Sequence, residues 1–196
     1  MKKLFLTLVL FAAVLAGSAQ TSLNTQQFNT KVPALDKSPL DMSYFPADYP
    51  MLKTQNKATQ APVARVIYSR PQRDNRVVFG ELVEYGKIWR LGANEATEIE
   101  FFKDVYISGK KLAKGRYTLY AIPTPEKWTL IFNKDTDTWG AFVYDEKKDV
   151  LRADVSVQTL PVAVEPFSIS FVKAEKGAGL VISWEKATVN LPIEIR

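Results

Sequence analysis

Residues 89–97, with the sequence WRLGANEAT, hold the densest group of side chains suited to chemistry. An arginine, an amide, a carboxylate and a hydroxyl follow a tryptophan, and Gly92 lets backbone amides approach a ligand closely. Arg70 precedes Pro71, which favours extended backbone at Arg70, and we expect Arg70 to converge on this loop. The predicted ligand-binding residues are Arg70, Arg90, Asn94, Glu95, Thr97 and Trp139.

Two interpretations of these residues stay open. Arginine and amide groups in one pocket suit a carboxylate, a sulfate or sugar hydroxyls. Alternatively, the two arginines pair with glutamates such as Glu95 and fasten the loop, since buried arginines must be paired. Trp139 follows a polar stretch and is the tryptophan expected to be accessible, whereas Trp128 and Trp184 alternate with polar positions and are predicted to be buried.

The composition excludes several kinds of active site. The chain contains no histidine and no cysteine, which removes histidine-based triads, histidine zinc sites and disulfides. Acid–base chemistry would therefore rest on carboxylates, and Glu95 is the candidate catalytic residue if the protein is a hydrolase. Residues 133–137 alternate oxygen-bearing side chains but lack the spacing of a calcium loop. We therefore expect no metal site and no cofactor.

The N-terminus has the layout of a secretory signal peptide. Two lysines precede an apolar run over residues 4–15, and small residues follow it, which predicts cleavage near Ala19 and export to a periplasmic or extracellular space. No later segment reaches the about 20 apolar residues needed to cross a bilayer, so we expect no transmembrane segment in the mature protein. Removing residues 1–19 lowers the formal charge from +5 to +3, and no basic stripe follows, so nucleic acid is not an expected partner.

The remaining elements must position the loop. Residues 20–62 lack a structural period and are predicted to be an extended N-terminal arm, whose aromatic residues Tyr44 and Phe45 lie in a groove. A flexible export linker is the alternative, since termini are usually loose unless they are tied down. Residues 63–196 are predicted to be one all-β domain, an antiparallel sandwich or flattened barrel of about ten strands with at most one short helix, over 79–85. The expected strands are 64–69, 97–102, 105–108, 115–122, 128–133, 139–144, 150–157, 167–173, 180–184 and 189–195.

Several blocks of the sequence resemble a bacterial family known as the domain of unknown function DUF2911. The resemblance covers about residues 63–193, and Leu35 to Pro39 in the arm are similar to exported members from Bacteroidota. The family has no established activity, so the resemblance implies none. The matching blocks are residues 68–71, 78–97, 115–123, 128–133, 139–142 with Tyr144, and 149–152.

Three functions remain open at this point. The leading hypothesis is a non-enzymatic exported domain that binds a small anionic or carbohydrate ligand in a pocket near the WRLGANEAT loop. The second is a carboxylate-based hydrolase that uses Glu95 with a partner acid. The third is a structural or interaction domain of the cell envelope, in which the arm docks on a neighbouring protein.

Overall fold

The computed structural model describes residues 32–196, so the predicted signal peptide lies outside the described residues. The following description concerns the unit Leu35–Arg196. No helix in residues 32–196 is long and apolar enough to cross a membrane. The elements in order are β1 (Leu40–Phe45), α1 (Tyr49–Thr54), β2 (Ala64–Ser69), β3 (Glu98–Phe101), β4 (Val105–Ile107), β5 (Lys110–Leu112), β6 (Gly115–Pro123), β7 (Lys127–Asn133), the 3₁₀-helix η1 (Glu146–Lys148), β8 (Asp149–Ser156), β9 (Gln158–Ala174) and β10 (Gly177–Glu194).

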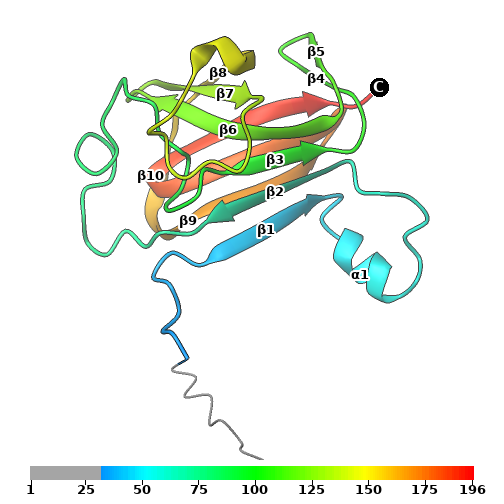
Figure 1. Ribbon diagram of the computed structural model, residues 1–196, viewed down its shortest axis with the longest axis horizontal. Coiled ribbons are helices and arrows are strands. Elements are labelled where there is room, and N and C mark those ends of the chain that lie inside the picture. The colour runs from blue at the N-terminus through cyan, green and yellow to red at the C-terminus, as the bar shows by residue number, and fades with distance from the viewer. Residues whose placement is uncertain (1–31) are drawn as a thin grey trace, which may run out of the picture. The chain divides into compact units, whose positions relative to one another are not determined.

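The strands form two antiparallel sheets. Six strands make one sheet in the order β1-β2-β3-β6-β7-β8, and four make the other in the order β5-β4-β10-β9. The four-stranded sheet lies across one face of the six-stranded sheet, where β9 contacts β1 and β2 and β10 contacts β8 (Figure 1). The predicted all-β antiparallel fold with at most one short helix is confirmed, although the α-helix present is α1, in the segment expected to be an arm.

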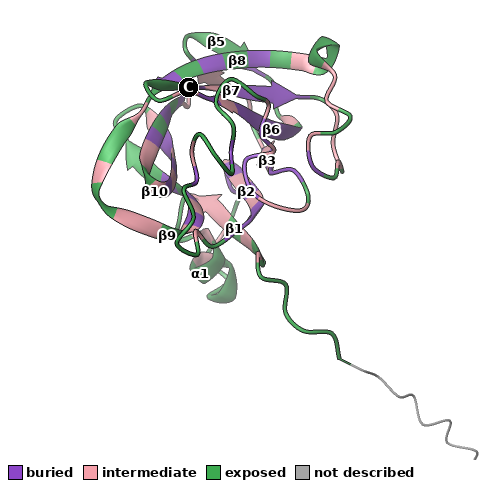
Figure 2. Ribbon diagram, turned by 90° about the vertical axis from the view of Figure 1, so that its left-hand side faces the viewer, coloured by how far each residue is buried: buried purple, intermediate pink, exposed green. Residues whose placement is uncertain are grey.

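The core lies between the two sheets because each strand that faces it alternates apolar and polar residues. Trp128, Leu130 and Phe132 of β7 are at most 1% exposed, as their spacing predicts. The alternation of buried and exposed positions is visible along β8 (Figure 2). Burying each large apolar side chain of this kind contributes about 1.5–3 kcal/mol to folding.

Two predicted elements are wrong. Residues 79–85 form turns rather than a helix, because Gly80 and Gly86 adopt φ of +96° and +72° at either end of this segment. Residues 139–144 form a turn rather than a strand, since Gly140 adopts φ of +68° and the chain reverses after Trp139. The side chains of residues 79–85 suit a short helix and those of residues 139–144 suit a strand. The positive φ angles of their glycines nevertheless turn the backbone at both places.

Two other segments differ from expectation in their extent. The strands expected at 180–184 and 189–195 are one continuous strand, β10. Its pairing with β9 shifts register around Glu185, where the sequence predicted a break between two strands. Glu185 has a φ of 52°, which is typical of an irregularity of this kind. Within the segment expected to be an arm, β1 pairs antiparallel with β2 along its whole length. Phe45 at its end packs against the core, with its ring centroid 6.2 Å from that of Phe171.

Candidate functional site

Trp89 fixes the start of the WRLGANEAT loop in the core. Its backbone exchanges both hydrogen bonds with Ala121 of β6, at 2.8 and 2.9 Å. Its indole lies nearly parallel to that of Trp184, with the ring centroids 6.0 Å apart, and it also meets the edges of Trp128 and Phe167. The side chain is 7% exposed, so Trp89 anchors the loop in the core.

Thr97 closes the other end of the loop. Its backbone N–H donates to the Arg90 carbonyl at 3.0 Å, and its hydroxyl donates to the Leu91 carbonyl. Leu91 tolerates a left-handed φ of 57° because its side chain is fully buried, which offsets a strain of about 1–3 kcal/mol. Thr97 is itself 0% exposed, so its hydroxyl braces the loop from below and is inaccessible to a ligand.

Between these anchors, Glu95 is paired with Trp139 across 44 positions of sequence. The two residues face each other in an isolated antiparallel bridge. The backbone N–H of Ala96 donates to the Thr138 carbonyl at 3.0 Å, and a second 3.0 Å hydrogen bond closes the other side of the pair. In this arrangement the facing Cα atoms lie about 4.5 Å apart and the side chains project to the same side. The backbone therefore places the carboxylate of Glu95 beside the indole of Trp139.

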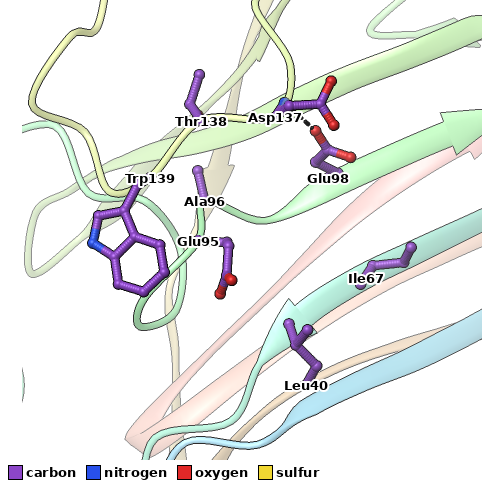
Figure 3. Close-up of a pocket in the computed structure, with 8 residues that line it drawn as sticks. All are labelled: Leu40, Ile67, Glu95, Ala96, Glu98, Asp137, Thr138 and Trp139. Carbon is purple, nitrogen blue, oxygen red and sulfur yellow. Dashed lines mark hydrogen bonds between the residues drawn. The ribbon is translucent and has the colours of Figure 1, made fainter.

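This pair borders a surface cavity of about 310 Å³. Trp139 is 59% exposed, which confirms the expectation that it is the accessible tryptophan. Figure 3 shows the Glu95 carboxylate pointing away from the Glu98–Asp137 pair. The volume lies at the lower end of the range for small-molecule sites. The lining residues come from β1, β2, β3 and two loops, and are Leu40, Ile67, Glu95, Ala96, Glu98, Asp137, Thr138 and Trp139.

Among the three carboxylates in this cavity, Glu98 and Asp137 are already engaged. One oxygen of Glu98 accepts the backbone N–H of Asp137 at 2.6 Å, and the other accepts from Arg116 at 3.2 Å. Arg116 also donates to the Asp137 carboxylate, and these two acids raise the pKa of Arg116. Glu95 has no hydrogen bond or ion pair with any residue in the described part of the chain. It is the carboxylate of this cavity that remains free for a ligand.

A polar network holds the loop that carries Trp139. Tyr144 donates its hydroxyl to Asp149 at 2.7 Å, and Arg152 donates to both, at 2.8 Å to each. Burial and the hydrogen bond to Asp149 raise the pKa of Tyr144 to about 12. Asn133, which is fully buried, donates to Asp149 at 2.7 Å. The loop that presents Trp139 is therefore fixed to β7 and β8 by side chains rather than by strand pairing.

The structure places Arg70 away from this cavity. Its guanidinium forms an ion pair with Asp41 of β1 at 2.9 Å and donates to the Phe167 carbonyl at 3.1 Å. Arg70 therefore forms an ion pair, as the second interpretation predicts. Its partner is an aspartate from the segment expected to be an arm rather than a glutamate. Arg70 links β1, β2 and β9 and lines neither the Glu95–Trp139 cavity nor the cavity at Arg90.

Arg90 lies in a second, separate cavity of about 180 Å³. Its Nε atom is buried without a hydrogen-bond partner, and burial lowers the pKa of the guanidinium. Asn94, with a φ of 55°, contributes its backbone carbonyl to Gly140, and its side chain makes no hydrogen bond with the described residues. The six residues predicted to form one site therefore divide into three groups. Glu95 and Trp139 meet, and Asn94 and Thr97 support the loop around them through hydrogen bonds. Arg70 and Arg90 lie elsewhere.

Comparison with known families identifies the chain. The sequence matches a family described as a protein of unknown function (DUF2911) over residues 50–193. The chain belongs to the DUF2911 family. No curated protein and no solved structure matches it. For this DUF2911 protein the match begins in α1, which extends beyond the resemblance expected from residue 63.

Sequence reasoning missed six residues that line the cavity of this DUF2911 protein: Leu40, Ile67, Ala96, Glu98, Asp137 and Thr138. Ile67 carried a usable signal, because it occupies the outward-facing position of β2 between buried Val66 and Tyr68. Leu40 carried none, since its place depends on β1 pairing with β2.

Proposed function

We propose that this DUF2911 protein is a non-enzymatic exported domain that binds a neutral carbohydrate in the cavity between Glu95 and Trp139. The observation that carries the proposal is the backbone pairing that sets an exposed indole beside a carboxylate that no described residue engages. An indole face buries apolar C–H surface such as that of a sugar ring, while a carboxylate accepts hydrogen bonds from hydroxyl groups.

The charge of the cavity favours a neutral ligand over an acidic one. Three carboxylates line it, those of Glu95, Glu98 and Asp137, and no basic side chain does among the described residues. Arg116 balances part of this charge through its ion pairs with Glu98 and Asp137, at 3.2 Å for Glu98. A second carboxylate brought in by a ligand would meet the free charge of Glu95, and the repulsion would weaken its binding.

The partners of Glu98 favour binding over hydrolysis. A glycoside hydrolase needs two carboxyl groups free to act on the scissile bond, spaced about 5 Å or about 6.5–9.5 Å apart. Both oxygens of Glu98 are engaged by Asp137 and Arg116, and the Glu95 carboxylate points away from that pair (Figure 3). Glu95 would act alone, so we propose binding without cleavage.

The test is to titrate the protein with neutral hexasaccharides of glucose, mannose and xylose and to measure binding by calorimetry. An oligogalacturonate serves as the acidic comparison. We expect one neutral ligand to bind, and the acidic one to bind more weakly. Trp139→Ala should weaken binding at least about tenfold, which corresponds to about 1.4 kcal/mol. Glu95→Gln should weaken it by a smaller factor, because the amide keeps one acceptor oxygen.

Matched controls separate the site from the general surface. Phe142→Ala removes an aromatic residue that is 84% exposed on the same loop but does not line the cavity. Glu175→Gln removes an exposed carboxylate in the turn between β9 and β10. Neither should change the affinity. Equal affinities of the wild type and Trp139→Ala would refute the proposal, and chromatographic detection of shortened oligosaccharides would replace it with the hydrolase.

Export is also proposed, on the layout of residues 1–19. Mass spectrometry of the chain recovered from a bacterial host should give a mature N-terminus at Gln20. Recovery of the uncleaved chain in the cytoplasm would contradict export. It would not affect the binding proposal, which the titration tests independently.

A further inference from the structure

Arg90 has no ionic partner among residues 32–196. Its Nε atom is buried, and its guanidinium forms no hydrogen bond and no ion pair with any residue in the described part of the chain. A guanidinium carries five N–H donors and remains protonated at neutral pH. Buried donors are nearly always satisfied, and a partly buried charge is costly unless it is paired. The described residues therefore leave the guanidinium of Arg90 without a hydrogen-bond acceptor or a countercharge.

The cavity in front of Arg90 has the chemistry of an anion site. It measures about 180 Å³, and a second arginine, Arg76, lines it together with Ser38. Trp89 and Trp184 form apolar walls that strengthen electrostatic interactions by excluding water. No carboxylate lines this cavity among residues 32–196.

Arg76 is held in place but keeps its charge uncompensated. Its Nε donates to the Arg73 carbonyl at 2.9 Å, and one terminal nitrogen donates to the Gln72 carbonyl at 2.6 Å. It forms no ion pair within the described residues. Carbonyl acceptors fix the direction of the guanidinium without neutralising it, so two positive charges border one small cavity.

The protein's own acids do not explain the arrangement. Residues 1–31 contain no aspartate and no glutamate, so the segment that precedes the described chain cannot contribute a carboxylate side chain. Glu185, the neighbour of Trp184 in the sequence, already accepts the Val78 N–H at 3.3 Å. Glu165 accepts the Asp74 N–H at 2.6 Å. No acid among the described residues forms an ion pair with Arg90 or with Arg76.

We infer that Arg90 and Arg76 form a second binding site, separate from the Glu95–Trp139 cavity, for the carboxylate, phosphate or sulfate group of a small ligand. The planar guanidinium of Arg90 offers two parallel N–H donors that match two oxygens of such a group. The size of the cavity admits one acidic group rather than a whole oligosaccharide. This site is independent of the proposed carbohydrate site, because its lining residues differ from those around Trp139.

The test is a titration of the full chain with inorganic phosphate, inorganic sulfate and acetate, each at constant ionic strength set with sodium chloride. We expect at least one anion to raise the Tm in a saturable manner, and the order of the three to identify the acidic group. Arg90→Gln should weaken this binding at least tenfold, and Arg76→Gln should weaken it by a smaller factor.

Arg65→Gln is the matched control, because Arg65 is also partly exposed but already pairs with Glu100 at 2.8 Å. It should bind the anion as the wild type does, and so should Trp139→Ala, which separates this site from the carbohydrate site. Absence of saturable binding by all three anions refutes the inference, as does unchanged binding by Arg90→Gln.

A second measurement distinguishes anion binding from bracing. In a buffer with chloride as its only anion, Arg90→Gln should have a Tm equal to or above that of the wild type, since the substitution removes an unpaired charge from a partly buried position. A lower Tm, or failure of the variant to fold, means that Arg90 braces the loop and refutes the inference.

Discussion

Replacing Thr97 with valine should loosen the loop that presents Glu95. The two side chains have nearly the same shape, so the change removes the hydroxyl and leaves the packing in place. The lost hydrogen bond runs from the Thr97 hydroxyl to the Leu91 carbonyl, and Thr97 and Leu91 are both 0% exposed. A buried carbonyl left without its donor costs the full penalty of its desolvation.

The expected loss is about 1–3 kcal/mol in the free energy of unfolding. For a domain of this size each kcal/mol lowers the Tm by about 2–4 °C. Urea denaturation followed by tryptophan fluorescence measures the loss, and Trp89 at the start of the loop makes the signal sensitive to this region. Thr159→Val is the control, since Thr159 is exposed on β9 and should change stability by at most about 0.5 kcal/mol.

A second readout ties the same substitution to function. If the Thr97 hydroxyl holds the loop that pairs Glu95 with Trp139, Thr97→Val should also weaken binding of the neutral oligosaccharide, although Thr97 cannot touch it. A loss of stability below about 0.5 kcal/mol would refute the reasoning that this hydrogen bond fixes the loop. Full destabilisation with unchanged affinity would show that the Glu95–Trp139 pair holds without it.

Three further predictions concern the residues around the two cavities. Gly92→Ala should destabilise the fold by about 1–3 kcal/mol, measured by urea denaturation, because Gly92 has a φ of 153° and an added Cβ would lie 3.1 Å from the Ser69 carbonyl oxygen; a neutral effect would contradict this. Trp139→Ala should change the free energy of unfolding by less than about 0.5 kcal/mol, since the side chain is 59% exposed, and a larger loss would make Trp139 a structural residue. The pKa of Tyr144, raised from 10.0 to about 12 by burial and by Asp149, means that the folded state keeps a proton that the unfolded state loses above pH 10. The stability contributed by Tyr144 is therefore complete below pH 10 and is lost as the pH rises towards 12. Tyr144→Phe should show a shallower loss of stability over this range, and identical slopes in both proteins would contradict the assignment.

The fold could largely be predicted because its strands are local patterns. Alternation along residues 128–133 and 167–173 reports which face is buried, and this holds whichever strand lies next to it. The errors occurred where one backbone position overrides the pattern. Gly140 turns the chain after Trp139, and the irregularity at Glu185 joins two expected strands into β10.

The candidate site could be predicted only in part, because its members meet through pairing between distant segments. The sequence identified Glu95 and Trp139 separately, as a carboxylate in a shaped loop and as an accessible aromatic residue. It also identified Arg70 and Arg90, yet it grouped them with Glu95 because they are close in sequence or aimed at the same loop. The two arginines differ in their ion pairing in the structure. Arg70 forms an ion pair with Asp41, and Arg90 forms none with the described residues.

The sequence by itself determined the family, the antiparallel β-sheets, the burial of Trp128 and Trp184, and the exclusion of histidine and cysteine chemistry. These depend on residue type and on spacing along one strand. Only the tertiary structure decided that Trp139 faces Glu95, that Thr97 lies beneath the loop, and that the loop borders two cavities of opposite charge. The physical reason is that a backbone bridge or an ion pair is fixed by which segments the sheets bring together, and no local period encodes that choice.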